Sequence, residues 1–200
     1  MQMSSLESRF ADLERKLKKR PLKLNPIKTL PFLIFHYAPS DEWKLRRLIT
    51  NIGIQLENEG KHIVCLSMEE LLWESLETIE QQNPIEGYSA VVELEKDSGF
   101  LEAQDQVITY FSDNDRCPLV EKIAKRLESL DSETHVVFLI HVAAMAPDLY
   151  QMHVLLDKLE GKTMVPTILF YPGSLDGITG LRFMDMRDRE PMGNYRVEIL

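Results

Sequence analysis

Two kinds of hydrophobic pattern alternate along this chain. Four runs of consecutive apolar residues have the length of a strand and are rich in β-branched and aromatic side chains: residues 32–37, 62–66, 135–141 and 165–171. Between these runs, apolar residues recur every three or four positions, which is typical of amphipathic helices. The alternation predicts a mainly parallel sheet with right-handed helical crossovers. Two shorter strands are predicted at residues 181–184 and 195–200.

The predicted helices have recognisable ends. One begins at Ser40, a good N-cap residue, and stops at Gly60, while the next begins with the capping box formed by Ser67 and Glu70 and runs to residue 82. Further helical segments are predicted at residues 86–96, 99–113, 118–131 and 147–161. Residues 68–130 therefore contain helices without a strand, which predicts a helical insertion on one edge of the α/β core.

An amphipathic helix is predicted before the first strand. Its apolar stripe consists of Leu6, Phe10, Leu13 and Leu17, which are spaced by four, three and four residues. Pro21 follows and cannot continue a helix interior. We expect the stripe either to dock on a partner protein or to pack against the chain's own sheet or helices, and the sequence leaves both alternatives open.

The expected fold class is a single α/β domain over residues 1–200, with an N-terminal helix and linker in residues 1–30. Its sheet lies in a three-layer α/β/α arrangement that is Rossmann-like or P-loop-like. A P-loop requires G-x-x-x-x-G-K-[ST], and the Gly-Lys pairs at residues 60–61 and 161–162 both lack its first glycine. The dinucleotide pattern G-x-G-x-x-G is also absent. We therefore expect the fold without a Walker A motif and expect no cofactor.

The charge is uneven along the chain. The 200 residues carry a formal net charge of -9, but residues 1–30 contain eight bases and three acids, a net charge of +5. Residues 69–105 contain eleven acids and a single base, Lys96. The acidic remainder of the chain repels nucleic acid. Direct contact with nucleic acid is therefore expected at most through the basic N-terminal segment, in residues 15–28. The acidic segment is either a solvated helical face or a complement to a basic partner.

We expect a cytoplasmic protein from three features of the sequence. Two cysteines cannot form a disulfide framework, and Cys65 lies in an apolar run that favours a reduced thiol. The longest apolar stretch, residues 136–147, is interrupted by His141 and is shorter than the ~20 residues needed to cross a bilayer. No secretory signal is visible at the N-terminus.

Several polar side chains lie near predicted strand ends, where parallel α/β sheets bind ligands. His36, His141, His153 and Asp176 form a candidate ligand site, because imidazole and carboxylate groups suit a metal ion or a general base. The alternative is that these histidines are hydrogen-bonded core residues. The glycine spacing around Ser174 is not that of a nucleophile elbow, so we expect the Pro-Gly and Asp-Gly pairs of residues 172–177 to form turns. No catalytic or metal site is assigned.

The most distinctive string of the C-terminal half contains Tyr171, Pro172, Gly173, Asp176 and Gly177. Further characteristic residues are Val137, Phe138, Leu139, Pro147, Leu149, His153, Leu155, Leu156, Leu159, Val165, Pro166, Leu169, Phe170, Leu181, Asn194, Tyr195 and Arg196. Together they resemble the BrxB family of BREX phage-defence systems. Ala143 and Ala146 depart from the pattern, at positions where glycine and an aromatic residue are frequent.

The resemblance implies a cytoplasmic accessory subunit of a bacterial defence complex. Its implied partners are other BREX proteins, namely the alkaline-phosphatase-like PglZ component and the AAA-type ATPase component. We therefore expect a non-enzymatic connector that acts by protein–protein interaction. The alternative is a nucleotide- or metal-binding enzyme that uses strand-end residues of a degenerate P-loop-like fold.

Overall fold

The structure is a computed structural model of the whole chain, and it describes residues 6–19, 22, 24, 30–113, 116, 118–145, 149–177, 180–188, 190–191 and 195–200. Its helices are α1 (Leu6–Leu17), α2 (Glu42–Asn58), α3 (Met68–Gln82), α4 (Tyr88–Ser98), α5 (Phe100–Ser112), α6 (Leu119–Glu128) and α8 (Met152–Leu159), with short 3-10 helices η1 (Pro39–Asp41) and η2 (Val142–Met145). Its strands are β1 (Phe32–Tyr37), β2 (His62–Ser67), β3 (His135–Ile140), β4 (Thr167–Asp176), β5 (Gly180–Phe183) and β6 (Glu198–Ile199).

The sheet is mainly parallel, as the sequence pattern predicts. Within the described chain its strand order is β2-β3-β4-β1-β6, and all neighbours along this path pair in parallel. β5 instead pairs antiparallel with the far end of β4, so that the two form a hairpin beyond the parallel sheet. Because β1, β3 and β4 are apolar on both faces, the sheet requires cover on both sides.

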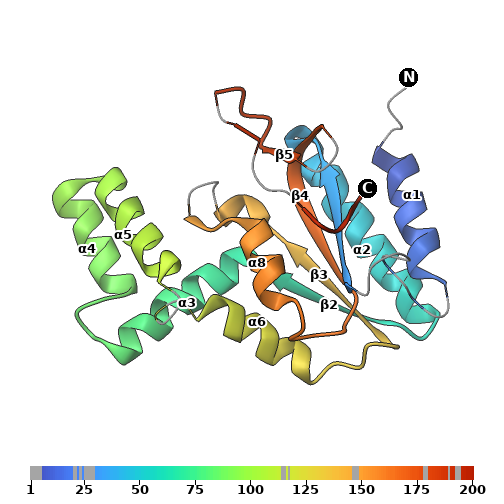
Figure 1. Cartoon of the computed structure of the whole chain (residues 1–200), viewed down its shortest axis with the longest axis horizontal. Helices are drawn as coiled ribbons and strands as arrows, with labels where there is room; N and C mark the ends of the chain where they lie inside the picture. Colours follow the sequence, from blue (N-terminus) through green and yellow to red (C-terminus); the bar gives the residue numbers. More distant parts are fainter. Residues whose placement is uncertain are drawn as a thin grey trace.

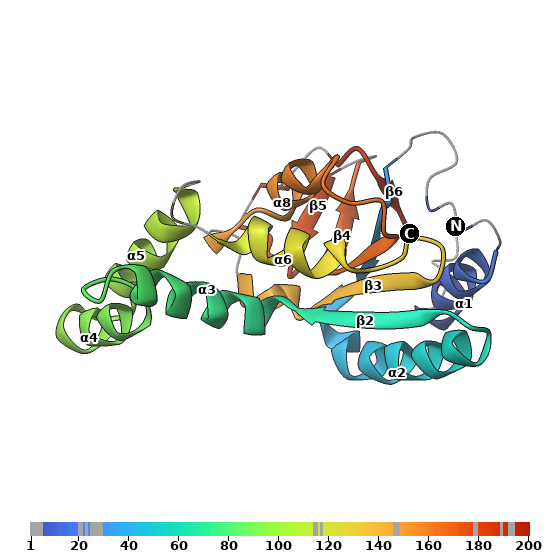
Figure 2. The same ribbon diagram turned by 90° about the horizontal axis from the view of Figure 1, so that it is seen from below.

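Helices supply that cover in two layers (Figures 1 and 2). α1 and α2 pack on one face, where Leu33 and Phe35 of β1 share a core with them. α3, α6 and α8 pack on the other face, against Phe32 and Ile34 of the same strand. Alternate residues of β1 thus enter different cores, as the pleat of a strand requires. The expected three-layer α/β/α fold is confirmed.

The apolar stripe of α1 packs against the chain's own sheet. Its four residues are at most 6% exposed, and two of them, Leu13 and Leu17, are fully buried. The ring of Phe10 lies edge-on to Phe35 at 5.5 Å between centroids and stacks on Phe170 at 6.4 Å. The ammonium group of buried Lys61 donates to the carbonyl oxygen of Leu17, at the end of the helix. Of the two alternatives that the sequence left open, packing of the stripe within the chain is therefore the one that the structure shows.

The connection from β2 to β3 contains α3, α4, α5 and α6, which matches the predicted helical insertion. β2 and β3 are adjacent, so the connection does not need this length to span the sheet. α3 is tied to α6 by Arg126, whose guanidinium nitrogen lies 2.7 Å from both carboxylate oxygens of Glu74. α3 continues from the carboxyl end of β2, and α4 and α5 lie at the far end of α3, away from the sheet (Figures 1 and 2). We call these two helices and the turn between them the arm.

Three details of the prediction were wrong. β4 continues to Asp176, so Pro172 and Gly173 lie inside a strand and not in a turn. Pairing with β5, which is remote from the local Pro-Gly signal, extends the strand. Ser40 does not cap α2, because η1 precedes that helix and Asp41 occupies the N-cap position. β6 is also shorter than predicted.

Other local predictions were accurate or fall outside the described residues. Ser67 caps α3 as expected, since its hydroxyl oxygen accepts from the Glu70 N–H at 3.3 Å. The predicted start of the last helix near Pro147, and the family-like positions Ala146 and Asn194, lie outside the described part of the chain. Among the described helices, none has an apolar segment long enough to cross a membrane.

The burial of α1 leads to a stability prediction. Leu13→Ala removes a fully buried side chain and leaves a cavity, so we expect the free energy of unfolding to fall by about 3 kcal/mol. Ile54→Ala, at a side chain of α2 that is 56% exposed, is the matched control and should change stability by less than about 0.5 kcal/mol. Urea denaturation measures both. Equal effects of the two variants would contradict the packing of α1 against the sheet.

Candidate functional site

A crevice of about 340 Å³ lies at the carboxyl ends of the parallel strands. Its walls include Tyr37 and Glu42 from the β1–α2 connection, His141 and Ala144 from the region after β3, and Pro172 from β4. The connections that follow β1 and β3 pack on opposite faces of the sheet, because α2 belongs to one core and η2 to the other. The crevice therefore occupies the switch point where open α/β sheets bind ligands.

A carboxylate with two partners forms one wall of the crevice. Glu42 accepts a hydrogen bond from the Tyr37 hydroxyl, and its other oxygen lies 2.7 Å from Nε of Arg46. The Arg46 guanidinium also lies 4.9 Å from the ring centroid of Trp43. Burial and the hydrogen bond to Glu42 raise the pKa of Tyr37, so its hydroxyl remains a neutral donor. The charge of Glu42 is thus offset by the chain's own side chains.

The opposite wall contains His141, whose backbone has a φ of 57°. This left-handed conformation is uncommon for a residue with a Cβ, and such residues concentrate at functional sites. Nδ1 of His141 lies 3.0 Å from the Ser67 hydroxyl oxygen, which also caps α3. The pair joins the end of β3 to the start of α3. Its imidazole could donate to or accept from a small polar ligand in the crevice.

The connection after β1 has none of the geometry of a phosphate cradle. Such a cradle requires consecutive backbone N–H groups that converge on an anion. Here η1 begins at Pro39, which has no N–H, and the N–H of Asp41 donates to the carbonyl oxygen of Ala38 at 2.8 Å. The N–H of Glu42 likewise donates to the carbonyl oxygen of Pro39, so the backbone of the turn itself engages both donors.

His36 has a structural position outside the crevice walls. Its Nε2 lies 2.9 Å from Nη1 of Arg9, its Nδ1 lies 3.2 Å from the carbonyl oxygen of Gly173, and its own carbonyl accepts from Arg9 Nη2 at 2.8 Å. A carbonyl can only accept, so Nδ1 donates and Nε2 accepts. Burial, together with the charge of Arg9, lowers the pKa of His36. The neutral ring joins α1, β1 and β4.

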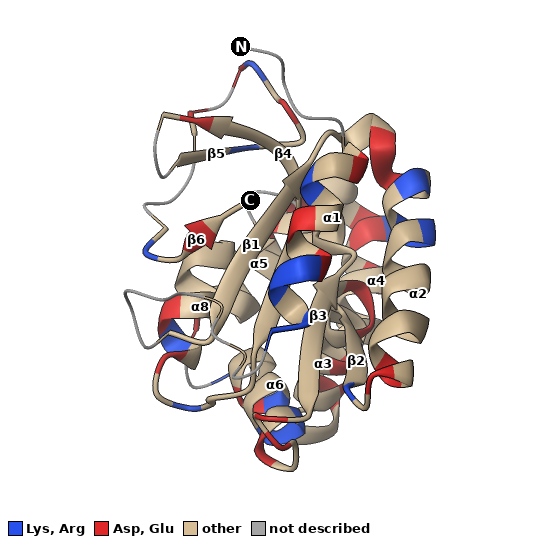
Figure 3. Ribbon diagram, turned by 90° about the vertical axis from the view of Figure 1, so that its right-hand side faces the viewer, with Lys and Arg blue, Asp and Glu red and all other residues tan. Residues whose placement is uncertain are grey.

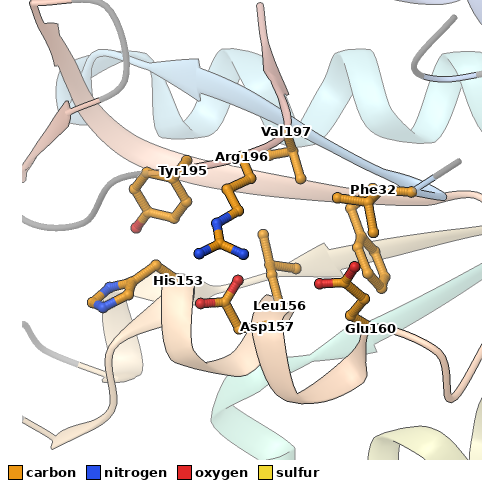
Figure 4. A pocket seen from close by; sticks show the side chains of 9 residues that line it. Phe32, His153, Leu156, Asp157, Glu160, Tyr195, Arg196 and Val197 are labelled. Atoms are coloured by element: carbon orange, nitrogen blue, oxygen red, sulfur yellow. The ribbon is translucent and has the colours of Figure 1, made fainter. Parts of the chain in front are cut away.

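His153 lies on the other face of the sheet, on α8. Its ring centroid is 6.0 Å from that of Tyr195, beside a cavity of about 10 Å³, which is the size of a single water molecule. Figure 4 shows the Arg196 side chain pointing from the C-terminal segment toward Asp157 of α8 in the same place. The Tyr195 hydroxyl is hydrogen-bonded to Tyr171, and burial raises the pKa of Tyr171 to about 12. This cluster attaches the C-terminal segment to α8.

Asp176, the fourth predicted ligand residue, lies 2.6 Å from an Arg182 guanidinium nitrogen across the β4–β5 hairpin. The structure therefore does not bring the four candidate residues together. Of the four, His141 alone lines the described crevice, while the other three belong to separate contacts. Within the described residues, no group of three or more His, Cys, Asp or Glu side chains could hold a metal ion.

The family-like string builds the junction between the parallel sheet and the hairpin. Gly173 has a φ of 145°, and a Cβ there would lie 2.0 Å from the carbonyl oxygen of Arg182. Tyr171 is buried and Pro172 pairs with Tyr37 in register, while Gly177, with a φ of 69°, follows the last residue of β4. Backbone geometry thus explains the two glycines of the string, Gly173 and Gly177.

Sequence reasoning missed the residues that form the crevice walls with His141. Tyr37 and Glu42 flank the end of β1, and Glu69 lies in the first turn of α3. Their position just after apolar strands was the available signal. The contact between Ser67 and His141 joins residues that are 74 positions apart, so it depends on tertiary packing, whereas Tyr37 and Glu42 are only five positions apart.

The basic residues of α1 are engaged within the chain. Lys16 lies 2.5 Å from a carboxylate oxygen of Glu198, and Lys18 is ion-paired with Glu14 and Glu59. Figure 3, which faces the end opposite the arm, shows acidic and basic segments mixed along α1 and α2. The positive charge of the basic N-terminal segment is therefore largely neutralised in the part that the structure describes. Arg15 is ion-paired with Asp12, whereas Arg20, Lys23 and Lys28 lie outside the described residues.

Comparison with known proteins assigns the family. The family model described as "BREX protein BrxB" matches residues 64–198, which is more than half of the chain. The chain belongs to the BrxB family. A curated relative, the BREX protein BrxB of Bacillus cereus (strain H3081.97), is 29% identical over 160 residues, which cover 78% of each protein. No solved structure matches the chain significantly.

The matched region places the BrxB pattern on the structure. It begins within β2 and ends in β6, so it includes the arm, His141 and the β4–β5 hairpin. α1, β1 and α2 lie before it. The predicted resemblance to the BrxB family is confirmed, and its most distinctive string coincides with the junction between the parallel sheet and the β4–β5 hairpin.

The close approach at Gly173 leads to a second prediction. Gly173→Ala places a Cβ in contact with backbone at a strained φ, so we expect the free energy of unfolding to fall by at least about 2 kcal/mol. Gly53→Ala is the control, because it lies in α2 with no atom within 4 Å of the new Cβ, and it should raise stability by up to about 1 kcal/mol. Thermal unfolding compares the two. Similar stability of both variants would contradict the geometry of the hairpin junction.

The environment of His36 leads to a prediction of pH dependence. Its pKa is lower in the folded protein than the ordinary value of 6.5, so the unfolded chain binds the proton more readily between these two values. The free energy of unfolding should therefore fall as the pH drops through about 6.5, by at most about 1.4 kcal/mol per pH unit, and level off below the folded-state pKa. Chemical denaturation between pH 7.5 and 5.5 measures this slope.

The control for that measurement is His36→Gln, which keeps a polar side chain but has no titrating group in this range. The difference in slope between wild type and variant isolates His36, because the other histidines are present in both proteins. Identical slopes would show that His36 is protonated equally easily in the folded and unfolded chains.

Proposed function

We propose that this protein is a non-enzymatic connector subunit of a BREX phage-defence system and acts by protein–protein interaction. Membership of the BrxB family, by the match over residues 64–198, carries the proposal. Its proposed partners are the alkaline-phosphatase-like PglZ component and the AAA-type ATPase component, with which it would assemble in the cytoplasm.

The shape of the structure supports a role in binding proteins. The arm extends away from the sheet (Figure 2), and α4 contributes no fully buried side chain. A helix so exposed gains little stability from packing in the isolated chain. A role in contacting another protein accounts for its presence better than a role in the core does.

The crevice gives weaker support to the alternative of a nucleotide- or metal-binding enzyme. Glu42 is engaged by Tyr37 and Arg46, and the Ser67 hydroxyl caps α3 while it contacts His141. These polar groups hold the connections around the crevice in place. The left-handed backbone of His141 is the feature of the crevice that favours a ligand role.

Co-expression tests the connector role. A tagged copy of the protein, produced with the PglZ component and the ATPase component, should elute with at least one of them as a complex of fixed stoichiometry in size-exclusion chromatography. The His141→Ala variant is the control, and it should form the same complex if the crevice is not used. Separate elution of all three proteins at micromolar concentration would contradict the proposal.

A further inference from the structure

The turn between α4 and α5 presents two large apolar side chains to solvent. Phe100 is 64% exposed and Leu101 is 68% exposed. They begin α5 directly after Gly99, whose φ of 100° turns the chain sharply between the two helices. Of the ten large hydrophobic residues that are exposed in the described chain, five lie between α3 and the first turn of α5: Trp73, Ile85, Tyr88, Phe100 and Leu101.

Exposed carboxylates surround this apolar pair. We call residues 93–105 the acidic tip, which contains Glu93, Glu95, Asp97, Glu102 and Asp105 against the single base Lys96. Among the ion pairs of the described residues, none involves these five acids. The tip thus has an unbalanced net charge of -4, whereas Arg15, Lys16 and Lys18 near the N-terminus have acidic partners.

An apolar centre with a charged rim is the usual anatomy of a protein interface. Large apolar side chains at the centre provide most of the binding free energy, while rim charges steer association and select the partner. The rim here is negative, so it attracts a basic surface and repels the phosphates of nucleic acids and of anionic lipids. Arg15, Lys16 and Lys18 are already paired with acids, so a second copy of this chain does not offer these bases as a matching basic surface.

We infer that the acidic tip is a docking surface for a basic partner protein, which receives Phe100 and Leu101 in an apolar pocket rimmed by Lys and Arg side chains. This inference rests on the proposed connector function and specifies the surface and the chemistry of the partner. The tip lies within the segment that matches the BrxB family. It also lies away from the sheet, so a partner can reach it without displacing the core (Figure 1).

Two sets of substitutions separate the apolar and electrostatic contributions. The double variant Phe100→Ser with Leu101→Ser removes the apolar pair. The triple variant Glu95→Gln, Asp97→Asn and Glu102→Gln removes rim charge and keeps the side-chain size. All five side chains are exposed, so the melting temperature of both variants should stay close to that of the wild type, which a thermal scan checks.

Binding is measured against the purified PglZ component and the purified ATPase component by biolayer interferometry at 50 and 300 mM NaCl. For the component that binds, the double variant should weaken the Kd at least about tenfold at both salt concentrations. The triple variant should lower the association rate at low salt and remove most of its salt dependence. Matched controls are Ile54→Ser on α2 and the triple variant Glu57→Gln, Glu128→Gln and Glu133→Gln, which should bind like the wild type.

The outcomes distinguish the tip from the connector role. If the wild type binds a component and both tip variants bind within twofold of it, the tip is not the docking surface, although the connector role stands. If the wild type binds neither component, both proposals are wrong. Light scattering tests the remaining occupant: a wild-type dimer that becomes a monomer in the double variant would show that a second copy covers the tip, which overturns the inferred basic partner.

Discussion

The central strands must be covered on both faces, and the rest of the structure depends on this constraint. β1, β3 and β4 place apolar side chains alternately in two cores, so a sheet with helices on one side would leave a hydrophobic face in water. α2 covers only part of its face. Phe10 of α1 fills the remainder by contact with Phe35 and Phe170, which explains why an N-terminal helix outside the BrxB-matched region is integral to the core.

Local signals predicted much of the fold from the sequence. β1 and α3 have the predicted bounds, because a continuous apolar run and a capping box are complete within a few residues. Pro172 and Gly173 were mispredicted as a turn, since Pro172 pairs with Tyr37 of β1 and Gly173 pairs with Phe183 of β5, both of which are separate in sequence. The candidate ligand residues were grouped because each lies near the predicted end of a strand. Nearness to a strand end does not determine where the side chains lie relative to one another. His153 lies on α8 beside Tyr195, away from the crevice walls, and extension of β4 carries Asp176 into the hairpin.

The charge pattern of the sequence acquires a different meaning in three dimensions. The excess of bases near the N-terminus indicated a possible contact with nucleic acid in the sequence. In the structure, Lys16 and Lys18 lie beside acids that are distant in sequence. The acidic segment of the insertion is only partly neutralised. Glu74 and Glu86 are ion-paired with Arg126 and Arg116, whereas the five acids of the tip form no ion pair among the described residues. Net charge along a sequence therefore predicted the sign of each region, while packing decided which charges remain available to a partner.

The crevice and the arm differ in how far their polar groups are already used. At the sheet edge, the contacts of Glu42 join β1 to α2, and the contact between Ser67 and His141 joins β3 to α3. Groups that could contact a ligand there also hold the connections in place, so ligand binding would compete with existing contacts. The tip has carboxylates without such contacts and apolar side chains that gain by losing water. The balance of free energy therefore favours the arm over the crevice as the docking surface of the proposed connector.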